Sequence, residues 1–225
     1  MQQKIPTQEG DYKFYLDKRD KNGRRFISPE GCTFYLSPAG PAEVEKLIDE
    51  LNLKKSTGPF GIPVFLLKRF KTFFSLWLSE LVNLSFETGI FPDVLKVAKV
   101  NPLHKKVSKI DHRNYRPISL LSVISKIFEK LIYKRIYYYL DQKKLIYSKR
   151  FGFRANYSTN HAIISLTEHI KKLLDKAEYV CGVFVDLEKA FDTVHHEILC
   201  EKIKVYGLRG NVNNLLKSYL NGRKQ

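Results

Sequence analysis

Cysteine is scarce in this 225-residue sequence, and its scarcity argues against two classes of protein. The three cysteines, Cys32, Cys181 and Cys200, are far apart, and no two of them form a Cys-x-x-Cys pair. Disulfide scaffolds and structural zinc sites both need closely spaced or repeated cysteines. We therefore expect reduced, buried thiols in an intracellular compartment and no zinc centre.

Long uninterrupted apolar runs are also missing. The most apolar stretch, residues 63–86, contains Lys68, Arg69, Lys71 and Glu80. A membrane-spanning helix needs about 20 predominantly apolar residues. The first residues also lack the pattern of a signal peptide. The sequence therefore predicts no membrane segment.

Acidic residues are few, with 23 Asp and Glu against 39 Lys and Arg, which gives a net charge of +16. Between residues 96 and 156 there are sixteen Lys and Arg but only three acids. A concentrated basic stretch with interleaved Tyr and Phe is typical of nucleic-acid binding. A solvated basic face and a patch for membrane surfaces remain open as alternatives at this point.

Apolar periodicity predicts helices over much of the chain. Val44, Leu47, Ile48 and Leu51 mark one face of a first helix, which ends at a loop rich in Gly and Pro, residues 54–63. Residues 64–88 are expected to form one long helix whose aromatic residues pack in the core. Further helices are expected over residues 119–140, after the cap Ser158, over residues 197–206 and over residues 213–220.

Two β segments are expected between the second and third of these helices. Residues 95–106 alternate apolar and polar side chains, and residues 111–121 form a second short stretch. A lysine-rich turn separates the two. The pattern predicts a basic hairpin, which is suited to holding a polyphosphate because Lys and Arg stabilise its negative charge.

A third β segment is expected at Val180–Val185, an almost continuous and β-branched apolar run. Such a run predicts a buried strand that would also bury Cys181. Asp186 follows it directly. A carboxylate at the end of a core strand is rigidly placed at an open sheet edge, where it can bind a metal ion. The alternative is that Asp186 only caps a following helix.

The same stretch carries a family resemblance. Asp186, four further residues and Phe191 resemble the first catalytic motif of reverse transcriptases. The string from Phe184 to Val194 is similar to the version in non-LTR (LINE-type, jockey-like) retrotransposons. Three further strings match the family in the same order along the chain: "KSTGPFGIP" at 55–63, "NYRPISLL" at 114–121 and "FGFR" at 151–154. Phe60 and Arg150 depart from the family, which usually has an acid and a Gln there.

The resemblance implies an α+β fold, mostly helical with a small sheet, that forms the fingers and partial palm of a right-hand polymerase. Residues 1–36 would be a connector, 37–156 a fingers-like region with the basic hairpin, and 157–225 a partial palm with the first catalytic motif. Such an enzyme acts on an RNA template, a DNA primer and dNTPs, uses Mg²⁺, and works in the nucleus.

The resemblance also assigns roles to residues. Asp186 would be catalytic and would bind Mg²⁺ together with the carbonyl of Leu187. The nucleotide would be bound by Lys105, Lys106, Arg113, Arg116, Lys189, Ala190 and Phe191. Template binding would fall to Phe153 and Arg154. Lys105 and Lys106 are equally well explained as turn lysines in solvent.

One element of the family is missing from the sequence. Two-metal phosphoryl transfer needs several carboxylates around the ions, and the family takes the others from an Asp-Asp hairpin. The sequence contains no Asp-Asp pair. We therefore expect this chain not to polymerise by itself. The alternative function is that of a basic nucleic-acid-binding remnant without chemistry, and the oligomeric state stays open.

Overall fold

The computed structural model describes residues 34–53, 58–104, 108, 110, 114–187 and 190–225. Two compact units are present. The described residues up to Tyr139, together with His195–Gln225, form what we call the helical unit. Leu140–Val194 form the central unit. Predicted site residues Lys105, Lys106, Arg113 and Lys189, and the predicted connector before residue 34, lie outside the described residues.

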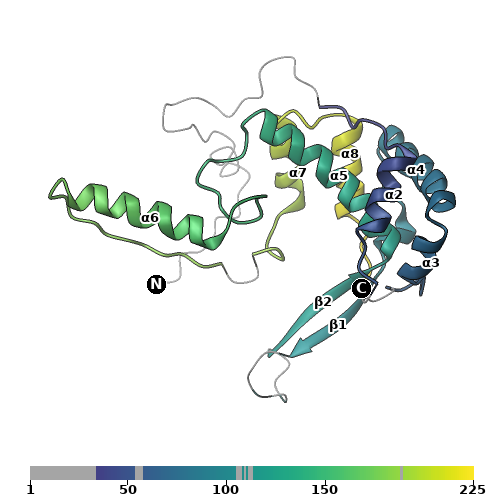
Figure 1. Ribbon diagram of the computed structural model, residues 1–225, viewed down its shortest axis with the longest axis horizontal. Helices are drawn as coiled ribbons and strands as arrows, with labels where there is room; N and C mark the ends of the chain where they lie inside the picture. The colour runs from purple at the N-terminus through teal and green to yellow at the C-terminus, as the bar shows by residue number, and fades with distance from the viewer. Residues whose placement is uncertain (1–33, 54–57, 105–107, 109, 111–113, 188–189) are drawn as a thin grey trace. The chain divides into compact units, whose positions relative to one another are not determined.

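The described part of the chain is mostly helical with one two-stranded sheet, as expected for this α+β chain (Figure 1). In chain order the elements are α2 (Pro41–Asp49), α3 (Val64–Arg69), α4 (Lys71–Thr88), the 3₁₀ turn η1 (Asp93–Lys96), β1 (Ala98–His104), β2 (Tyr115–Leu121), α5 (Val123–Gln142), α6 (Thr159–Leu174), α7 (His196–Val205) and α8 (Asn211–Leu220). No helix of the described residues is long and apolar enough to cross a membrane.

The first helix forms where the apolar spacing predicts it. Pro41 occupies the first turn of α2, where a missing N–H costs nothing. Val44, Leu47 and Ile48 are fully buried, and Leu51 just after the helix is nearly so. The next expected helix is divided, because Phe70 leaves helical geometry (φ −113°, ψ 33°) between α3 and α4. The division places the ammonium groups of Lys68 and Lys71 on Asp49, at the end of α2.

The prediction that the aromatic residues of 64–88 form core is wrong for most of them. Phe65, Phe70, Phe73 and Trp77 are each more than half exposed, and only Phe86 is buried. A second periodicity explains the result, because small residues recur on the opposite face. The buried face of α4 consists of Ser75, Leu78, Ser79, Val82, Ser85 and Phe86. Serines let α4 approach α2 closely, so the bulky side chains point outward.

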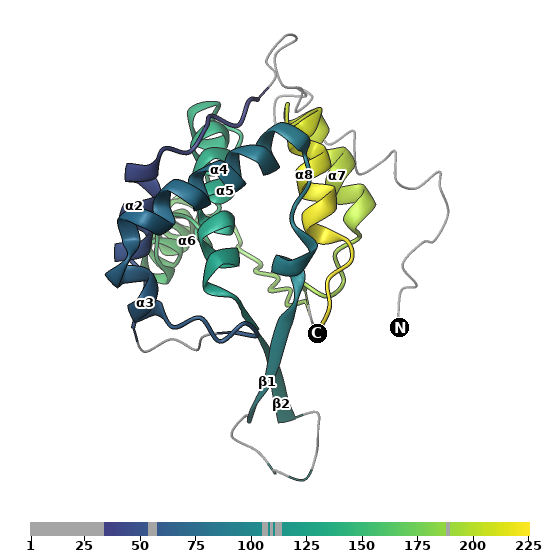
Figure 2. The same ribbon diagram turned by 90° about the vertical axis from the view of Figure 1, so that its right-hand side faces the viewer.

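Arg135 joins helix α5 to α2, to the segment before α2 and to α4. The guanidinium of Arg135 donates hydrogen bonds to the carbonyl oxygens of Ser37 (2.5 Å) and Pro38 (2.9 Å) and pairs with Glu43. It also lies over the ring of Phe86. Figure 2 shows these helices together with α7 and α8 above the β-hairpin. Helix α5 begins at Val123 and not at Ser119, because residues 119–121 belong to β2.

The predicted pairing of the two β segments is confirmed, while most of the lysine-rich turn between them lies outside the described residues. Strands β1 and β2 pair antiparallel, with Ala98 opposite Leu121 and His104 opposite Tyr115. The base of the hairpin is held to the rest of the helical unit at two places. The N–H of Ala98 donates to the carbonyl of Lys224, and the turn at Gly58 lies against the backbone of Leu121.

The end of α8 is held beside this base. The hydroxyl of Tyr219 donates to Glu129 of α5 (2.8 Å), and the guanidinium of Arg223 stacks on the Tyr219 ring. Burial, aided by the nearby Glu129 carboxylate, raises the pKa of Tyr219 to about 12. Tyr219 therefore stays a neutral hydrogen-bond donor at physiological pH.

Two expectations for the central unit are wrong. Residues 180–185 are extended, but among the described residues nothing pairs with them as a strand, and Val183, Phe184 and Val185 are at least 80% exposed. Cys181 is exposed, whereas Cys200 in the helical unit is buried. Helix α6 begins after Ser158 as predicted, yet none of its residues is buried. An apolar run becomes a buried strand only when a neighbouring strand and a covering layer are available.

The turn at residues 58–61, which lies against the end of β2, offers a matched stability test. Gly58 and Gly61 both have positive φ, but a Cβ at Gly58 would lie 2.6 Å from the carbonyl oxygen of Leu121, whereas one at Gly61 meets nothing within 4 Å. We expect Gly58→Ala to lower the free energy of unfolding by roughly 3 kcal/mol and Gly61→Ala by about 1 kcal/mol. Urea denaturation followed by circular dichroism measures both. Equal losses would show that the contact with Leu121 does not matter.

Candidate nucleotide and template site

The hairpin presents one predicted nucleotide-binding residue within the described part. Arg116 lies in β2 opposite Leu103 and is exposed. The segment that joins the strands contains Lys105, Lys106 and Arg113, which are outside the described residues. Their proposed role as a triphosphate clamp therefore stays a prediction.

The strand register adds a residue that the sequence reasoning did not include. Lys99 is exposed and lies opposite Leu120, so it is on the same face of the hairpin as Arg116. The two positions are four residues apart along the sheet, about 13 Å. The alternation within residues 98–104 was visible in the sequence, but only the pairing register shows that both side chains share one face.

Asp186 is exposed in the extended part of the central unit, and its carboxylate accepts a hydrogen bond from the N–H of Leu187 (3.0 Å). It is not the cap of a described helix, since α7 begins only at His196. After the undescribed Glu188 and Lys189 the chain forms a turn, in which the hydroxyl of Thr193 donates to the carbonyl of Ala190. Asp186 and Leu187 are both exposed.

A Mg²⁺ ion bound at Asp186 would need further oxygen ligands close to that side chain. Among the described residues no group of three His, Cys, Asp or Glu side chains gathers to hold a metal ion. Mg²⁺ needs oxygen ligands in near-octahedral geometry, and two-metal catalysis needs several carboxylates. The described residues therefore supply Asp186 but not a complete metal site.

The central unit brings two of the predicted site segments together. The rings of Phe153 and Phe191 are 5.8 Å apart between centroids and meet edge to face at 85°. Both are more than three-quarters exposed. Phe153 has φ +54°, in the left-handed region that residues other than glycine rarely adopt. The segment predicted to bind template thus contacts an aromatic residue predicted to bind the nucleotide.

Arg154, the other residue predicted to bind template, is engaged within its own unit. Its guanidinium lies 4.3 Å above the Tyr157 ring and 3.9 Å from the Asp141 carboxylate, and its side chain is 16% exposed. Its Nη1 atom is buried and has no hydrogen-bond partner in the described part of the chain. The observed contacts assign Arg154 an anchoring role for the turn that carries Phe153.

The predicted residues thus fall into two groups. Arg116 belongs to the helical unit, whereas Phe153, Arg154, Asp186, Leu187, Ala190 and Phe191 belong to the central unit. The structure brings Phe153 and Phe191 into contact. The other members of the second group lie in the same unit.

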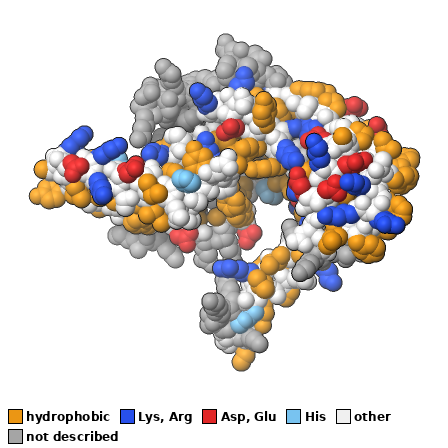
Figure 3. Space-filling model, in the orientation of Figure 1, with side chains coloured by type: hydrophobic (Ala, Val, Ile, Leu, Met, Phe, Trp, Pro, Cys, Tyr) orange, Lys and Arg blue, Asp and Glu red, His pale blue; other side chains and the backbone are white. Residues whose placement is uncertain are grey.

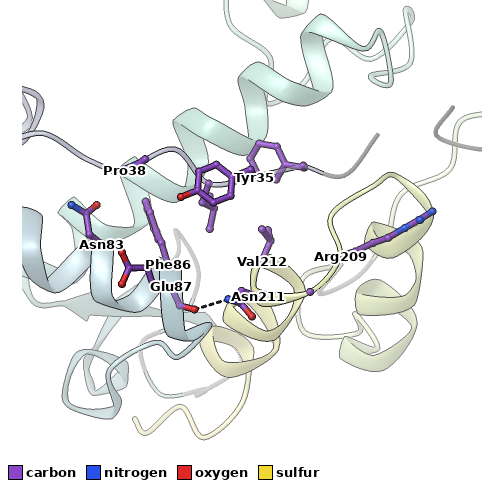
Figure 4. Close-up of a pocket in the computed structure, with 11 residues that line it drawn as sticks. Tyr35, Pro38, Asn83, Phe86, Glu87, Arg209, Asn211 and Val212 are labelled. Carbon is purple, nitrogen blue, oxygen red and sulfur yellow. Dashed lines mark hydrogen bonds between the residues drawn. The ribbon is translucent and has the colours of Figure 1, made fainter. Parts of the chain in front are cut away.

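A cavity of about 350 Å³ lies elsewhere, in the helical unit, between residues 34–38, α4 and the start of α8 (Figure 4). Leu36, Phe86 and Val212 contribute apolar surface, and no predicted site residue lines it. Its two asparagine amides are bonded within the protein, since the Asn83 amide bonds the backbone of Ala39 and Asn211 donates to the Glu87 carbonyl. These bonds indicate a structural gap more than a ligand site.

Comparison with known proteins gives a family match. Residues 103–225, which include β2 and the whole central unit, match the family described as "Reverse transcriptase (RNA-dependent DNA polymerase)". This matched region contains every predicted site residue. It begins inside β1, so the helices before the hairpin lie outside it.

Curated relatives match over more of the chain. This chain is 34% identical over 191 residues to the "Probable RNA-directed DNA polymerase from transposon BS" of Drosophila melanogaster. The aligned residues make up 83% of this chain and 21% of the relative. This chain is also 32% identical over 178 residues to the "RNA-directed DNA polymerase from mobile element jockey" of the same species, covering 79% and 19%. The chain therefore spans about a fifth of the length of these relatives.

The aromatic contact can be tested directly. With Phe residues isotopically labelled, we expect NMR cross-peaks between the rings of Phe153 and Phe191, and upfield-shifted Phe191 ring protons, because edge-to-face packing places them in a ring current. Phe153→Ala should remove both signals. Phe151→Ala is the matched control, since Phe151 packs on Tyr157 instead. Unchanged Phe191 shifts in Phe153→Ala would rule out the contact.

Proposed function

Because the chain belongs to the reverse transcriptase family of non-LTR retrotransposons, we propose that it provides nucleotide- and template-binding parts of an RNA-directed DNA polymerase. The partners of this activity are an RNA template, a DNA primer and a dNTP, and the cofactor is Mg²⁺. Its site of action is the nucleus. The contact between Phe153 and Phe191 carries the proposal, since it joins two family motifs in one small unit.

In this proposal the aromatic pair forms the floor for the incoming nucleotide. Phe191 lies beneath the sugar and excludes a 2′-hydroxyl, while Phe153 holds the Phe191 ring by its edge-to-face contact. Arg154 fixes the turn through Tyr157 and Asp141. An aromatic pair is worth about 0.5–1.5 kcal/mol beyond its buried area, enough to bias the orientation of an exposed ring.

The hairpin binds the triphosphate of the nucleotide in this proposal. A triphosphate carries several negative charges, and nucleotidyl transfer moves further charge onto the leaving pyrophosphate. Arg116 and Lys99 present cations on one face of the hairpin, and Lys105, Lys106 and Arg113 extend this charge through the connecting segment. Such preorganised cations stabilise charge where it develops.

Asp186 contributes one carboxylate to the magnesium site, with the Leu187 carbonyl beside it. The remaining metal ligands come from outside the described residues, because these contain no cluster of three suitable side chains. The chain as given is therefore expected to bind substrates without completing the chemistry.

A second candidate function is nucleic-acid binding without catalysis. The net charge of +16 favours it, since counterion release drives binding to polyanions regardless of sequence. Both candidates predict RNA binding by this chain. They differ in whether Asp186 ever takes part in nucleotide addition.

The expected absence of catalysis is tested by primer extension. The purified chain, given an RNA template, an annealed DNA primer, dNTPs and Mg²⁺, should incorporate no nucleotide, because one carboxylate cannot hold two ions. Asp186→Asn should be indistinguishable from it. Incorporation that the Asp186→Asn variant abolishes would show that the chain is a complete enzyme.

The role of the hairpin is tested by the salt dependence of RNA binding. Lys105→Gln/Lys106→Gln should flatten the slope of log affinity against log salt by roughly 0.7 for each lysine that contacts a phosphate. Lys171→Gln/Lys172→Gln, at the end of α6, changes the charge equally and should leave the slope unchanged. Fluorescence anisotropy with a labelled single-stranded RNA measures both. The same slope in the two double variants would contradict contacts between the hairpin lysines and RNA phosphates.

A further inference from the structure

The outward side of α4 carries a row of apolar side chains that the polymerase function does not use. We call it the α4 outer face, and it consists of Phe70, Phe73, Leu76, Trp77, Leu81 and Leu84. Each is about half or more exposed, with Trp77 at 62% and Phe73 at 59%. Figure 3 shows hydrophobic side chains gathered at the right-hand edge of the molecule, where α4 lies.

The spacing makes this row a packing surface. Phe73, Trp77 and Leu84 recur at i, i+4 and i+11, and Leu81 and Phe70 lie next to them around the helix. The buried serines of α4 are on the opposite side. One helix therefore has two faces of the same period, one used inside the unit and the other free to pack on another surface.

The size of the face suits a moderate protein interface. A whole aromatic side chain offers roughly 150–250 Å², so six side chains that are half exposed or more offer roughly 500 Å² together. Patches of that size are at the upper end for monomers and often functional. A stable complex buries about 800 Å² on each partner. With roughly 500 Å² on each copy, the face lies at the lower end of the range, where association is weak and reversible.

The charges around the face favour a second copy of this chain as the occupant. Arg69 precedes the N-terminal end of α4, and Glu87 lies near its C-terminal end. Both are exposed, and neither forms an ion pair within the part of the chain that the structure describes. Two α4 helices packed antiparallel would place each Arg69 toward the Glu87 of the other copy. A parallel arrangement would place like charges together.

We propose that two copies of the chain associate through antiparallel α4 helices across a two-fold axis at Trp77. In this register Phe73 faces Leu81 of the second copy and Phe70 faces Leu84, so each apolar contact occurs twice. An isologous interface of this kind closes at the dimer. The aromatic residues then become the buried centre of the interface, and the charged pairs become its rim.

The chain contains its own probe, because Trp77 is its single tryptophan. Raising the concentration of the purified chain through the micromolar range should shift the Trp77 emission to shorter wavelength. Sedimentation velocity on the same samples should show the mass rising from one chain to two. A constant monomer mass with the emission of an exposed tryptophan throughout would overturn the proposal.

Substitution at the face separates specific pairing from general stickiness. Phe73→Lys should raise the dimer dissociation constant about tenfold or more. Tyr138→Lys is the matched control, since Tyr138 is equally exposed (67%) on another helix of the helical unit and should not change it. Circular dichroism shows whether both variants fold. Equal weakening by the two variants would overturn the assignment to α4.

A charge exchange tests the antiparallel geometry. Arg69→Glu alone and Glu87→Arg alone should each weaken the dimer, because each creates two like-charge contacts. The double variant carries the exchanged pair twice and should restore the original dissociation constant. A double variant weaker than both single variants would overturn the antiparallel arrangement. A shift of Trp77 emission that occurs only with phosphatidylcholine vesicles would assign the face to lipid and also overturn the proposal.

Discussion

The buried guanidinium of Arg135 is the interaction on which the helical unit depends. Only 9% of its side chain is exposed, and its donors reach two backbone carbonyls before α2, the Glu43 carboxylate and the ring of Phe86. A buried charge without such partners would be strongly destabilising. Because these partners come from α2, α4 and the preceding segment, one side chain of α5 determines how three helices meet. The apolar core, including Phe128 and Leu131, fills the space between them.

That packing determines where the basic hairpin begins. Strand β2 leads directly into α5, the Gly58 turn lies against Leu121, and the backbone at Lys224 bonds the start of β1. The hairpin itself buries little, so its cations are held from the base. A clamp for a polyphosphate needs this combination of a rigid base and an exposed charged surface, because charge stabilisation depends on preorganised groups.

The central unit shows the limit of pattern reasoning. The run from Val180 to Val185 has the composition of a buried strand, and the apolar face of α6 has the spacing of a buried helix, yet both are exposed. Composition states which side chains favour burial, but it does not supply the surface that buries them. The same reasoning applies to α4, which has two faces that could pack in the core. The face that contains the serines is the buried one. The aromatic face was left outside and becomes the basis for the proposed dimer.

The sequence by itself determined the family, the mostly helical α+β class, the antiparallel hairpin and the buried face of α2. These features follow from local periodicity, turn residues and short strings, which need no knowledge of distant contacts. Tertiary structure alone decided three others: the shared face of Lys99 and Arg116, the contact of Phe153 with Phe191, and the outward side of α4. Each depends on pairing register or on competition between surfaces. Residues far apart in the chain settle these outcomes together, because only the folded arrangement states which surfaces are available to be covered.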